Sequence, residues 1–322
     1  MLNNSLTRIL QIRYPIIQGG LAYVANGKLA AAVSNAGGLG QVGAAGRTPE
    51  AFREQIRVAK SLTDQPFGVN IPVSRHTDNS PYVQVALEEA ANIVSVSLSA
   101  GDPRPFVPSL KAAGLKVLLV VATVRQAVRA QEVGADVLIC EGFEAGGHDS
   151  PLENTVFTLV PQVVQIAEVP VVAAGGVASG RQVAAAFMLG AEGVQMGTRF
   201  VATAECEAHP RYKDLLVQAG DDGTVVLERT LGVSTRVLKN DYAAAALDVE
   251  RADPSGLKLR PLMTGERNRL AAIDGRTDEG YLYAGQSVGL ISSVVPAGEA
   301  IEQIVEETRR ALGNTSQYQA WL

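Results

Sequence analysis

The sequence predicts an α/β fold, a (β/α)8 TIM barrel with a helical insertion between its eighth strand and its last helix. Eight short apolar runs recur along the chain, and each ends near a glycine or a polar loop. Alanine-rich helical stretches follow these runs, so that strands and helices alternate. The runs lack the two-residue alternation of half-buried strands, which is typical of parallel strands buried on both faces. An open doubly wound sheet is the alternative.

The strands and helices are expected in strict alternation along the chain. The predicted strands are Pro15–Gln18, Gly38–Val42, Phe67–Ile71, Ile93–Leu98, Lys116–Val121, Val137–Cys140, Val171–Ala174 and Gly193–Met196. The predicted helices between them are Lys28–Ala36, Pro49–Leu62, Pro81–Ala91, Phe106–Ala113, Val124–Val133, Leu159–Ala167 and Gly180–Leu189. Glycines such as Gly114 and Gly190 follow the helices and suit helix C-caps.

The alternation breaks after the eighth strand, at residues 203–284. This stretch has mixed charge and no clear strand series, and we expect one helix through Ala243–Ala246. We therefore expect residues 204–284 to form a mainly helical insertion over the C-terminal face of a barrel made by residues 1–203 and 285–322. Loops at Ser74–Pro81 and Glu144–Thr155 are expected on the same face.

The last helix is predicted at Pro296–Leu312. Its acidic residues, beginning with Glu299, come early, and Arg309 and Arg310 come late. Acidic residues near the N-terminus and basic residues near the C-terminus complement the helix dipole. We expect this helix to close the barrel.

Composition excludes several classes of protein. Apolar residues make up 47% and charged residues 19% of 322 residues, as in globular proteins. The net charge of −5 disfavours nucleic-acid binding, and no apolar run reaches the length of a membrane span. The two cysteines form no disulfide framework or zinc pattern, and the first residues do not resemble a secretion signal. We expect a cytoplasmic protein without a metal site.

Glycine pairs after the seventh and eighth strands predict a phosphate site. Gly175 and Gly176 follow one strand, and Gly197 and Thr198 follow the next. The loops after these two strands often bind phosphate in such barrels, because bare main-chain N–H groups and a helix N-terminus can approach an anion. The alternative is that these glycines only make tight turns. Neither a GxGxxG nor a P-loop motif occurs.

The other strand ends predict a site for a planar ligand. Gly19 and Gly20 close the first strand, Asn70 lies at the end of the third, and EGFEAGGH at 141–148 ends the sixth. Glycine-rich walls, an amide and a phosphate cradle are the groups that a flavin mononucleotide would use.

His148 is the candidate catalytic residue. The chain has only three histidines, His76, His148 and His209. His148 follows two glycines at the C-terminal end of a barrel strand, where catalytic groups gather, and imidazole exchanges protons near neutral pH. The alternative is a solvated loop histidine. Glu141 and Glu144 either orient it, contact the ligand ring or are solvated acids.

Six ordered segments resemble the nitronate monooxygenase family, which includes the flavin-dependent type II enoyl-acyl-carrier-protein reductases. The resemblance runs from Tyr14 to about Thr230 and resumes at Gly285–Leu290. The segments are PIIQGG at 15–20, NAGGLG at 35–40, PFGVNI at 66–71, EGFEAGGH at 141–148, AAGGVASG at 173–180 and GVQMGTRFVAT at 193–203. The resemblance implies a (β/α)8 barrel that holds FMN without a covalent link.

The resemblance also implies roles for individual residues. It implies that His148 is catalytic. It implies flavin contacts by Gly20, Leu21, Ala22, Asn70, Glu141 and Gly146. It implies phosphate contacts by Gly176, Val177, Gly197 and Thr198, with Gln195 beside them.

The motifs are closer to the reductase branch than to the monooxygenase branch. EGFEAGGHDSP is nearer to the reductase pattern EGMEAGGHIG than to DGFECAGHPGE, and GQSVGL at 285–290 also looks reductase-like. Asp149 and Ser150 depart from both patterns. Val120 stands where some family members carry a lysine near the flavin.

Two activities share this predicted site, and a third class is possible. The first is NADH- or NADPH-dependent reduction of an activated C=C bond, such as that of an enoyl thioester, with acyl carrier protein as a candidate partner. The second is oxidation of alkyl nitronates with O2, with His148 as the base. The third is a phosphate-binding barrel without redox chemistry. A homodimer is expected, because most soluble oligomers are homodimers.

Overall fold

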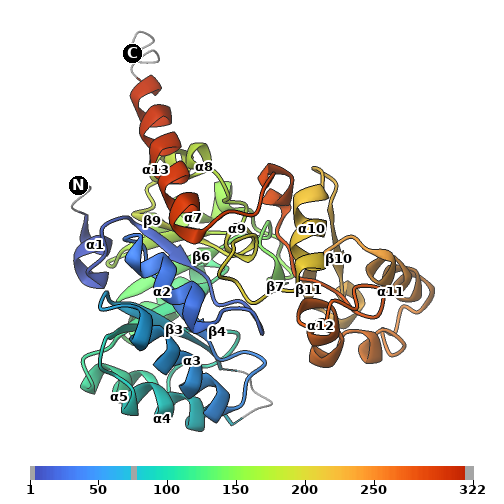
Figure 1. Cartoon of the computed structure of the whole chain (residues 1–322), viewed down its shortest axis with the longest axis horizontal. Helices are drawn as coiled ribbons and strands as arrows, with labels where there is room; N and C mark the ends of the chain where they lie inside the picture. Colours follow the sequence, from blue (N-terminus) through green and yellow to red (C-terminus); the bar gives the residue numbers. More distant parts are fainter. Residues whose placement is uncertain (1–3, 74–77, 316–322) are drawn as a thin grey trace.

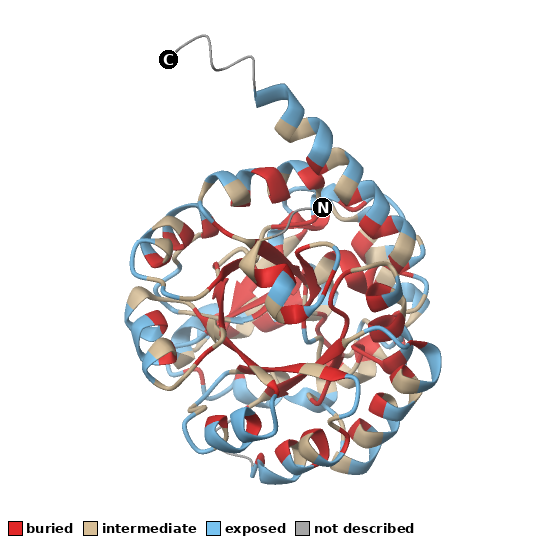
Figure 2. Ribbon diagram, turned by 90° about the vertical axis from the view of Figure 1, so that its left-hand side faces the viewer, coloured by how far each residue is buried: buried red, intermediate tan, exposed pale blue. Residues whose placement is uncertain are grey.

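Eight parallel strands form a closed barrel in a computed structural model that describes residues 4–73 and 78–315. The sheet order is β1-β9-β8-β6-β5-β4-β3-β2, and a bridge between Ile17 and Leu39 joins its two edges. Figure 2 shows the ring of buried strands with helices around it. The strands are β1 (Ile16–Gln18), β2 (Gln41–Gly43), β3 (Phe67–Pro72), β4 (Ile93–Ser99), β5 (Lys116–Val121), β6 (Val137–Glu141), β8 (Val171–Ala174) and β9 (Gly193–Met196).

Within the described part of the chain, eight helices surround this barrel. They are α2 (Gly27–Asn35), α3 (Pro49–Leu62), α4 (Ser80–Glu88), α5 (Val107–Ala112), α6 (Val124–Glu132), α7 (Val156–Val164), α8 (Gly180–Met188) and α13 (Ala297–Gly313). The last of them, α13, packs against α8 and α2 and so closes the ring of helices. The predicted barrel is confirmed, and its predicted elements lie within a few residues of those observed.

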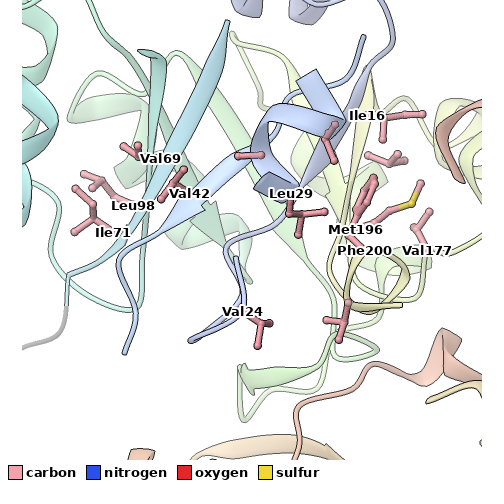
Figure 3. Close-up of a cluster of buried hydrophobic side chains, with 14 of the residues drawn as sticks. Ile16, Val24, Leu29, Val42, Val69, Ile71, Leu98, Val177, Met196 and Phe200 are labelled. Carbon is pink, nitrogen blue, oxygen red and sulfur yellow. The ribbon is translucent and has the colours of Figure 1, made fainter. Parts of the chain in front are cut away.

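Alternate residues along each strand pack in two separate layers, as the pleat requires. Val69, Ile71 and Leu98 belong to the layer between strands and helices (Figure 3). Ile17 and Ile139 belong to the layer inside the barrel.

A short helix, α1 (Ser5–Leu10), fills one end of the barrel and was not expected from the sequence. Its Leu6 and Leu10 are fully buried among the inward-facing strand residues. Asn4 caps the helix, because its side chain accepts a hydrogen bond from the N–H of Thr7. Six residues are too few for a periodic pattern, so packing rather than local sequence stabilises this helix.

The insertion contains strands that the sequence analysis missed. Strands β10 (Thr224–Leu227) and β11 (Ser234–Leu238) form an antiparallel sheet with β7 (Gly147–Asp149). The sequence analysis expected no strand series in residues 203–284, which is wrong, and the loop expected at Glu144–Thr155 contains the short strand β7. These strands are short and pair across distant parts of the chain, so local pattern could not reveal them.

Helices make up most of the rest of the insertion. They are α10 (Pro210–Gln218), α11 (Asp241–Ala252) and α12 (Gly265–Ala272), with 3-10 turns η1 (Arg229–Leu231) and η2 (Arg260–Leu262). The short helix α9 (Thr198–Val201) precedes the insertion, and the 3-10 turn η3 (Gln286–Leu290) follows it. The helix expected through Ala243–Ala246 is α11. Figure 1 shows α10, α11 and α12 at the end of the barrel opposite α1.

One predicted loop and the expected lack of a membrane span remain to be compared with the structure. His76 and residues 74–77 of the loop expected at Ser74–Pro81 lie outside the described residues. Within residues 4–73 and 78–315, no helix is long and apolar enough to cross a membrane.

Candidate active site

Inward-facing polar side chains gather at the C-terminal end of the barrel. Asn70 faces inward because its neighbours Val69 and Ile71 face the helices. Its Nδ2 donates to the carbonyl and hydroxyl oxygens of Ser97, both at 3.4 Å. These contacts fix the side-chain amide at the end of β3.

A second group of amides lies beside it on β1, β2 and β9. Gln41 Nε2 donates to Gln195 Oε1 at 3.3 Å and to the Gln18 carbonyl oxygen at 2.9 Å. Gln41 Oε1 is buried and accepts no hydrogen bond from the described residues. A buried polar atom without a partner calls for a ligand or an ordered water.

The loop after β1 passes directly over Asn70. A methyl group at Gly20 would lie 2.1 Å from Asn70 Oδ1, so only glycine allows this approach. The half-buried Leu21 and Ala22 follow, and a methyl group at Gly197 would lie 3.3 Å from Leu21 Cδ2. The fold thus brings the first loop to the loop that follows β9.

The loops after β8 and β9 lie side by side, because Ala174 of β8 pairs with Gln195 of β9. Gly176 has a φ of +69°, a left-handed conformation that favours glycine. The N–H groups of Gly176, Val177 and Gly197 donate to no residue in the described part of the chain. Thr198 Oγ1 accepts from the N–H of Gly285 at 2.9 Å, which leaves its own proton free to donate.

The N-terminus of α8 is held beside these groups by a capping box. The Ser179 side chain accepts from the N–H of Gln182, and Gln182 Oε1 accepts from the N–H groups of Ala178 and Ser179 at 2.9 and 3.1 Å. Gln182 Nε2 also donates to the Gly176 carbonyl oxygen. One side chain therefore fixes the whole turn between β8 and α8.

The segment after β6 packs against the chain where it returns from the insertion. A methyl group at Gly146 would lie 2.6 Å from the carbonyl carbon of Ala284, and the N–H of Gln286 donates to the Glu144 carbonyl oxygen at 2.9 Å. Glu144 Oε2 accepts from the N–H of Val156 at 3.0 Å. Glu144 therefore caps α7, an outcome the sequence had left open.

Glu141 is the last residue of β6 and faces into the barrel. Burial raises the pKa of Glu141 to about 7. The carboxyl group thus holds or releases a proton near neutral pH.

His148 lies on β7, opposite Thr235 of β11. Its Nε2 is 4.0 Å from Glu228 Oε2, and its ring centroid is 5.8 Å from that of Tyr283. The side chain is 62% exposed, whereas that of Glu228 is 12% exposed. The histidine predicted from the barrel motif is thus held by a sheet that the insertion completes.

Asp149 is a residue whose environment the sequence analysis did not foresee. Neither carboxylate oxygen has a hydrogen-bond partner among the described residues. Burial, followed by the negative charge of Glu141, raises the pKa of Asp149 to about 9. Arg236 opposes this shift, but its guanidinium is committed to the Phe143 carbonyl oxygen at 3.0 Å. Asp149 therefore keeps its proton at neutral pH.

Nothing local in the sequence marks Arg236 or Glu228 as site residues. Arg236 and Glu228 come from the stretch in which no strand was expected, and their positions follow from the pairing of β7 with β11. The departure from the family pattern at Asp149 was the one visible signal.

The arrangement fits an anionic, planar cofactor such as FMN. The unpartnered N–H groups of Gly176, Val177 and Gly197 match the needs of a phosphate. The unpaired Gln41 Oε1 and the glycine-lined approach at Gly20 suit a flat ligand with polar edges.

No cluster of histidine, cysteine and acidic side chains suited to a metal occurs among the residues with described positions. Cys140 is buried and unpaired, and burial raises the pKa of its thiol to about 12.

Comparison with known proteins agrees with this geometry. A family model described as nitronate monooxygenase matches residues 3–307. FabK from Thermotoga maritima superimposes with a TM-score of 0.92 at 40% identity, covering 99% of this chain and 100% of that one. A nitroalkane oxidase from Streptomyces ansochromogenes superimposes with a TM-score of 0.84 at 28% identity, covering 97% and 99%.

Curated relatives are similar over nearly the whole chain. A "Probable nitronate monooxygenase" of Staphylococcus haemolyticus is 31% identical, over 96% of this chain and 98% of that protein. A Mycobacterium tuberculosis protein named (3aS,4S,5R,7aS)-5-hydroxy-7a-methyl-1-oxo-octahydro-1H-indene-4-carboxyl-CoA dehydrogenase is 32% identical, over 94% and 95%.

The fold and the rim of the barrel thus define an oxidoreductase built on a (β/α)8 barrel. The chain belongs to the nitronate monooxygenase family. Membership of this family excludes the third function that the sequence analysis had left open, a phosphate-binding barrel without redox chemistry.

Proposed function

We propose that this protein is an FMN-dependent reductase that uses NADH or NADPH to reduce the C=C bond of an enoyl thioester. The observation that carries the proposal is the similarity to FabK, a type II enoyl-acyl-carrier-protein reductase, at 40% identity over 99% of this chain. The relative from Mycobacterium tuberculosis is named for an acyl-CoA substrate, which supports a thioester as the substrate class.

The residues at the rim suit this reaction. Bound FMN would supply hydride transfer from the nicotinamide to the β-carbon of the enoyl thioester. The main-chain N–H groups of Gly176, Val177 and Gly197 would bind its phosphate, with Thr198 donating its hydroxyl proton. The amides of Asn70 and Gln195, with the Gly20–Ala22 loop, Glu141 and Gly146, would line the ring and its chain.

His148 would give the second hydrogen of the reduction as a proton to the α-carbon. Its side chain is largely exposed at the rim, so that a substrate entering from solvent can meet it. An imidazole is suited to this role, and loss of such an acid costs about 100-fold or more in rate. We expect His148→Gln to lower kcat by that factor while FMN binding is retained.

Nitronate oxidation is the second candidate function. It is favoured by the matching family model and by the similarity to a nitroalkane oxidase at 28% identity. In that reaction His148 would take a proton from the nitroalkane or hold the nitronate. The motif EGFEAGGH and Val120 favour the reductase instead.

Parallel assays distinguish the two functions. Anaerobic stopped-flow mixing with NADH, NADPH and propionate 3-nitronate follows the flavin absorbance, and steady-state assays follow crotonyl-thioester reduction and O2 uptake. We expect rapid reduction by one nicotinamide and turnover of enoyl thioesters, delivered as coenzyme A or acyl-carrier-protein esters. Nitronate-dependent O2 uptake without turnover of any enoyl thioester would overturn the proposal.

Two accompanying expectations need separate measurements. We propose a homodimer, which sedimentation measurements can test. A cytoplasmic location stays a prediction from the sequence.

A further inference from the structure

We infer that Glu228, which the insertion contributes, is the positioning residue for His148 and sets which imidazole nitrogen exchanges a proton with the substrate. Its carboxylate faces Nε2 at 4.0 Å, which favours the proton on Nε2 in the neutral ring and leaves Nδ1 to exchange a proton with the substrate. This inference rests on the role proposed for His148 and deepens it.

The register of the small sheet places the two residues together. Thr235 of β11 lies directly opposite His148 of β7, and neighbouring residues point to alternate faces. The hydroxyl of Thr235 donates to Glu228 Oε2 at 2.5 Å. The residue that pairs with the histidine thus also holds the carboxylate in front of it.

The main-chain conformation at Glu228 places its side chain in front of the histidine. Glu228 has a φ of +68°, a left-handed conformation that a residue with a side chain adopts at a cost. Buried Glu250 supports it, accepting from the N–H of Glu228 at 3.0 Å and from the N–H and hydroxyl of Thr230 at 2.9 and 3.0 Å. The carboxylate of Glu250 therefore fixes the turn between β10 and β11 through these hydrogen bonds.

The charge of Glu228 is directed at the histidine. The carboxylate is shielded from water, and His148 is its one ion-pair partner among the residues the structure describes. The neighbouring Tyr283 does not compete, because burial and Glu228 raise its pKa to about 12 and the phenol keeps its proton. A shielded charge acts more strongly on a nearby group than an exposed one.

The consequence for the histidine is a defined tautomer. The nitrogen that faces a carboxylate carries the proton, and the other nitrogen becomes the acceptor. In the proposed reduction, the positively charged, doubly protonated ring gives its Nδ1 proton to the α-carbon and becomes neutral, with its other proton on Nε2 facing Glu228. The separation of 4.0 Å is that of an ion pair, and such contacts often tighten when substrate binds.

Nuclear magnetic resonance of the imidazole nitrogens tests the tautomer directly. The chain has only three histidines, so 15N-histidine labelling of the holoenzyme gives few signals. The spectrum is recorded about two pH units above the ordinary imidazole pKa of about 6.5. The variant His148→Gln identifies which signals belong to His148. His209 is an internal reference for a ring protonated at Nε2, because its Nδ1 accepts a hydrogen bond from the N–H of Arg211 at 3.2 Å.

The expected result is protonated Nε2 at His148 in the wild type and a mixture of tautomers in Glu228→Gln. The glutamine still accepts the hydrogen bond of Thr235, so the turn keeps its support. Protonated Nδ1 in the wild type, or an unchanged spectrum in Glu228→Gln, would overturn the inference. Protonated Nδ1 in the wild type overturns the inference even where no variant folds.

Kinetics provide the second readout. We expect Glu228→Gln to lower kcat for enoyl-thioester reduction about tenfold, with KM changed less than about twofold, and Glu228→Asp to recover part of the loss. Glu153→Gln is the matched control, because it removes an exposed acid that pairs with Arg229. Equal rates for Glu228→Gln and Glu153→Gln would contradict a positioning role.

The test separates this inference from the proposed function. A protein without enoyl-thioester turnover in which Nε2 of His148 is protonated in the wild type and only partly protonated in Glu228→Gln overturns the reductase proposal and supports the pairing with Glu228.

Discussion

Gly176 and Gly114 share a left-handed main-chain conformation, with φ of +69° and +79°, but only Gly176 lies on the rim of the candidate site. A methyl group at Gly176 would lie 3.1 Å from Glu144 Cβ, whereas one at Gly114 would meet nothing within 4 Å. Replacing Gly114 tests only the cost of the left-handed main-chain conformation. Replacing Gly176 tests that cost together with the need for space beside a ligand.

We predict that Gly176→Ala and Gly114→Ala each lower the free energy of unfolding by about 1–2 kcal/mol, because both strain the main chain. Only Gly176→Ala should also reduce FMN binding, since it crowds the proposed phosphate loop. Urea unfolding and fluorescence titration with FMN measure the two effects. Equal FMN affinity in both variants would argue against a phosphate site at Gly176.

Buried acids make stability depend on pH. The pKa values of Asp149 and Glu141 are raised to about 9 and about 7, so the folded state holds protons that the unfolded state releases. The contribution of these two acids to stability is therefore fully present below their unfolded-state pKa values of about 4 and is lost as pH rises toward about 9.

We predict that the melting temperature of the flavin-free protein falls between about pH 5 and about pH 9, and that Asp149→Asn flattens this fall. Asparagine keeps the shape of the protonated acid but cannot ionise. Thermal unfolding across this pH range measures the effect. A variant as pH-dependent as the wild type would show that Asp149 is ionised in the folded protein.

At the scale of elements, α8 links the proposed phosphate loop to the rest of the barrel. Gln182 holds the turn before α8 through Gly176, Ala178 and Ser179. Glu307 of α13 accepts from the N–H of Gly180 at 2.7 Å, so the last helix also supports this N-terminus. The loop is thus positioned by elements from both ends of the chain.

We predict that Gln182→Ala lowers the free energy of unfolding by about 1–2 kcal/mol, because three polar groups lose their partner. It should also weaken FMN binding by loosening the loop. Arg181→Ala is the control, since this side chain is 85% exposed and its loss should change stability by less than about 0.5 kcal/mol. Chemical unfolding and FMN titration of both variants test the difference.

The molecule as a whole combines a barrel that presents main chain at its rim with an insertion that supplies side chains to the same rim. Arg236 and Glu228 reach the segment after β6 from the sheet of β10 and β11. The insertion therefore contributes side chains to the candidate site in addition to lying beside it.

We predict that FMN at about 100 times its Kd stabilises the protein by about 2.7 kcal/mol, a rise in melting temperature of roughly 4 °C for a chain of this length. Riboflavin, which lacks the phosphate, should give a much smaller rise at the same concentration. Thermal shift measurements with both compounds test this. Equal shifts would contradict a phosphate cradle at the rim.

Much of the barrel was predictable because its elements are repetitive and local. The strands Lys116–Val121, Val171–Ala174 and Gly193–Met196 and the helix Pro49–Leu62 have the predicted bounds. Apolar runs, capping residues and glycines act over a few residues, so the sequence displays them directly. The helix α1 and the strand β7 were missed because both depend on packing against distant segments.

The sequence by itself determined the barrel, the glycine-rich loops at its rim, and the presence of a histidine after β6. Only the tertiary structure decided what surrounds that histidine. The pairing of β7 with β11 brings Glu228 to His148 and buries Asp149 without a hydrogen-bond partner in the described structure. Strand pairing is a contact between segments far apart in the chain, and burial sets the charge of the groups it encloses, so neither can be read from local pattern.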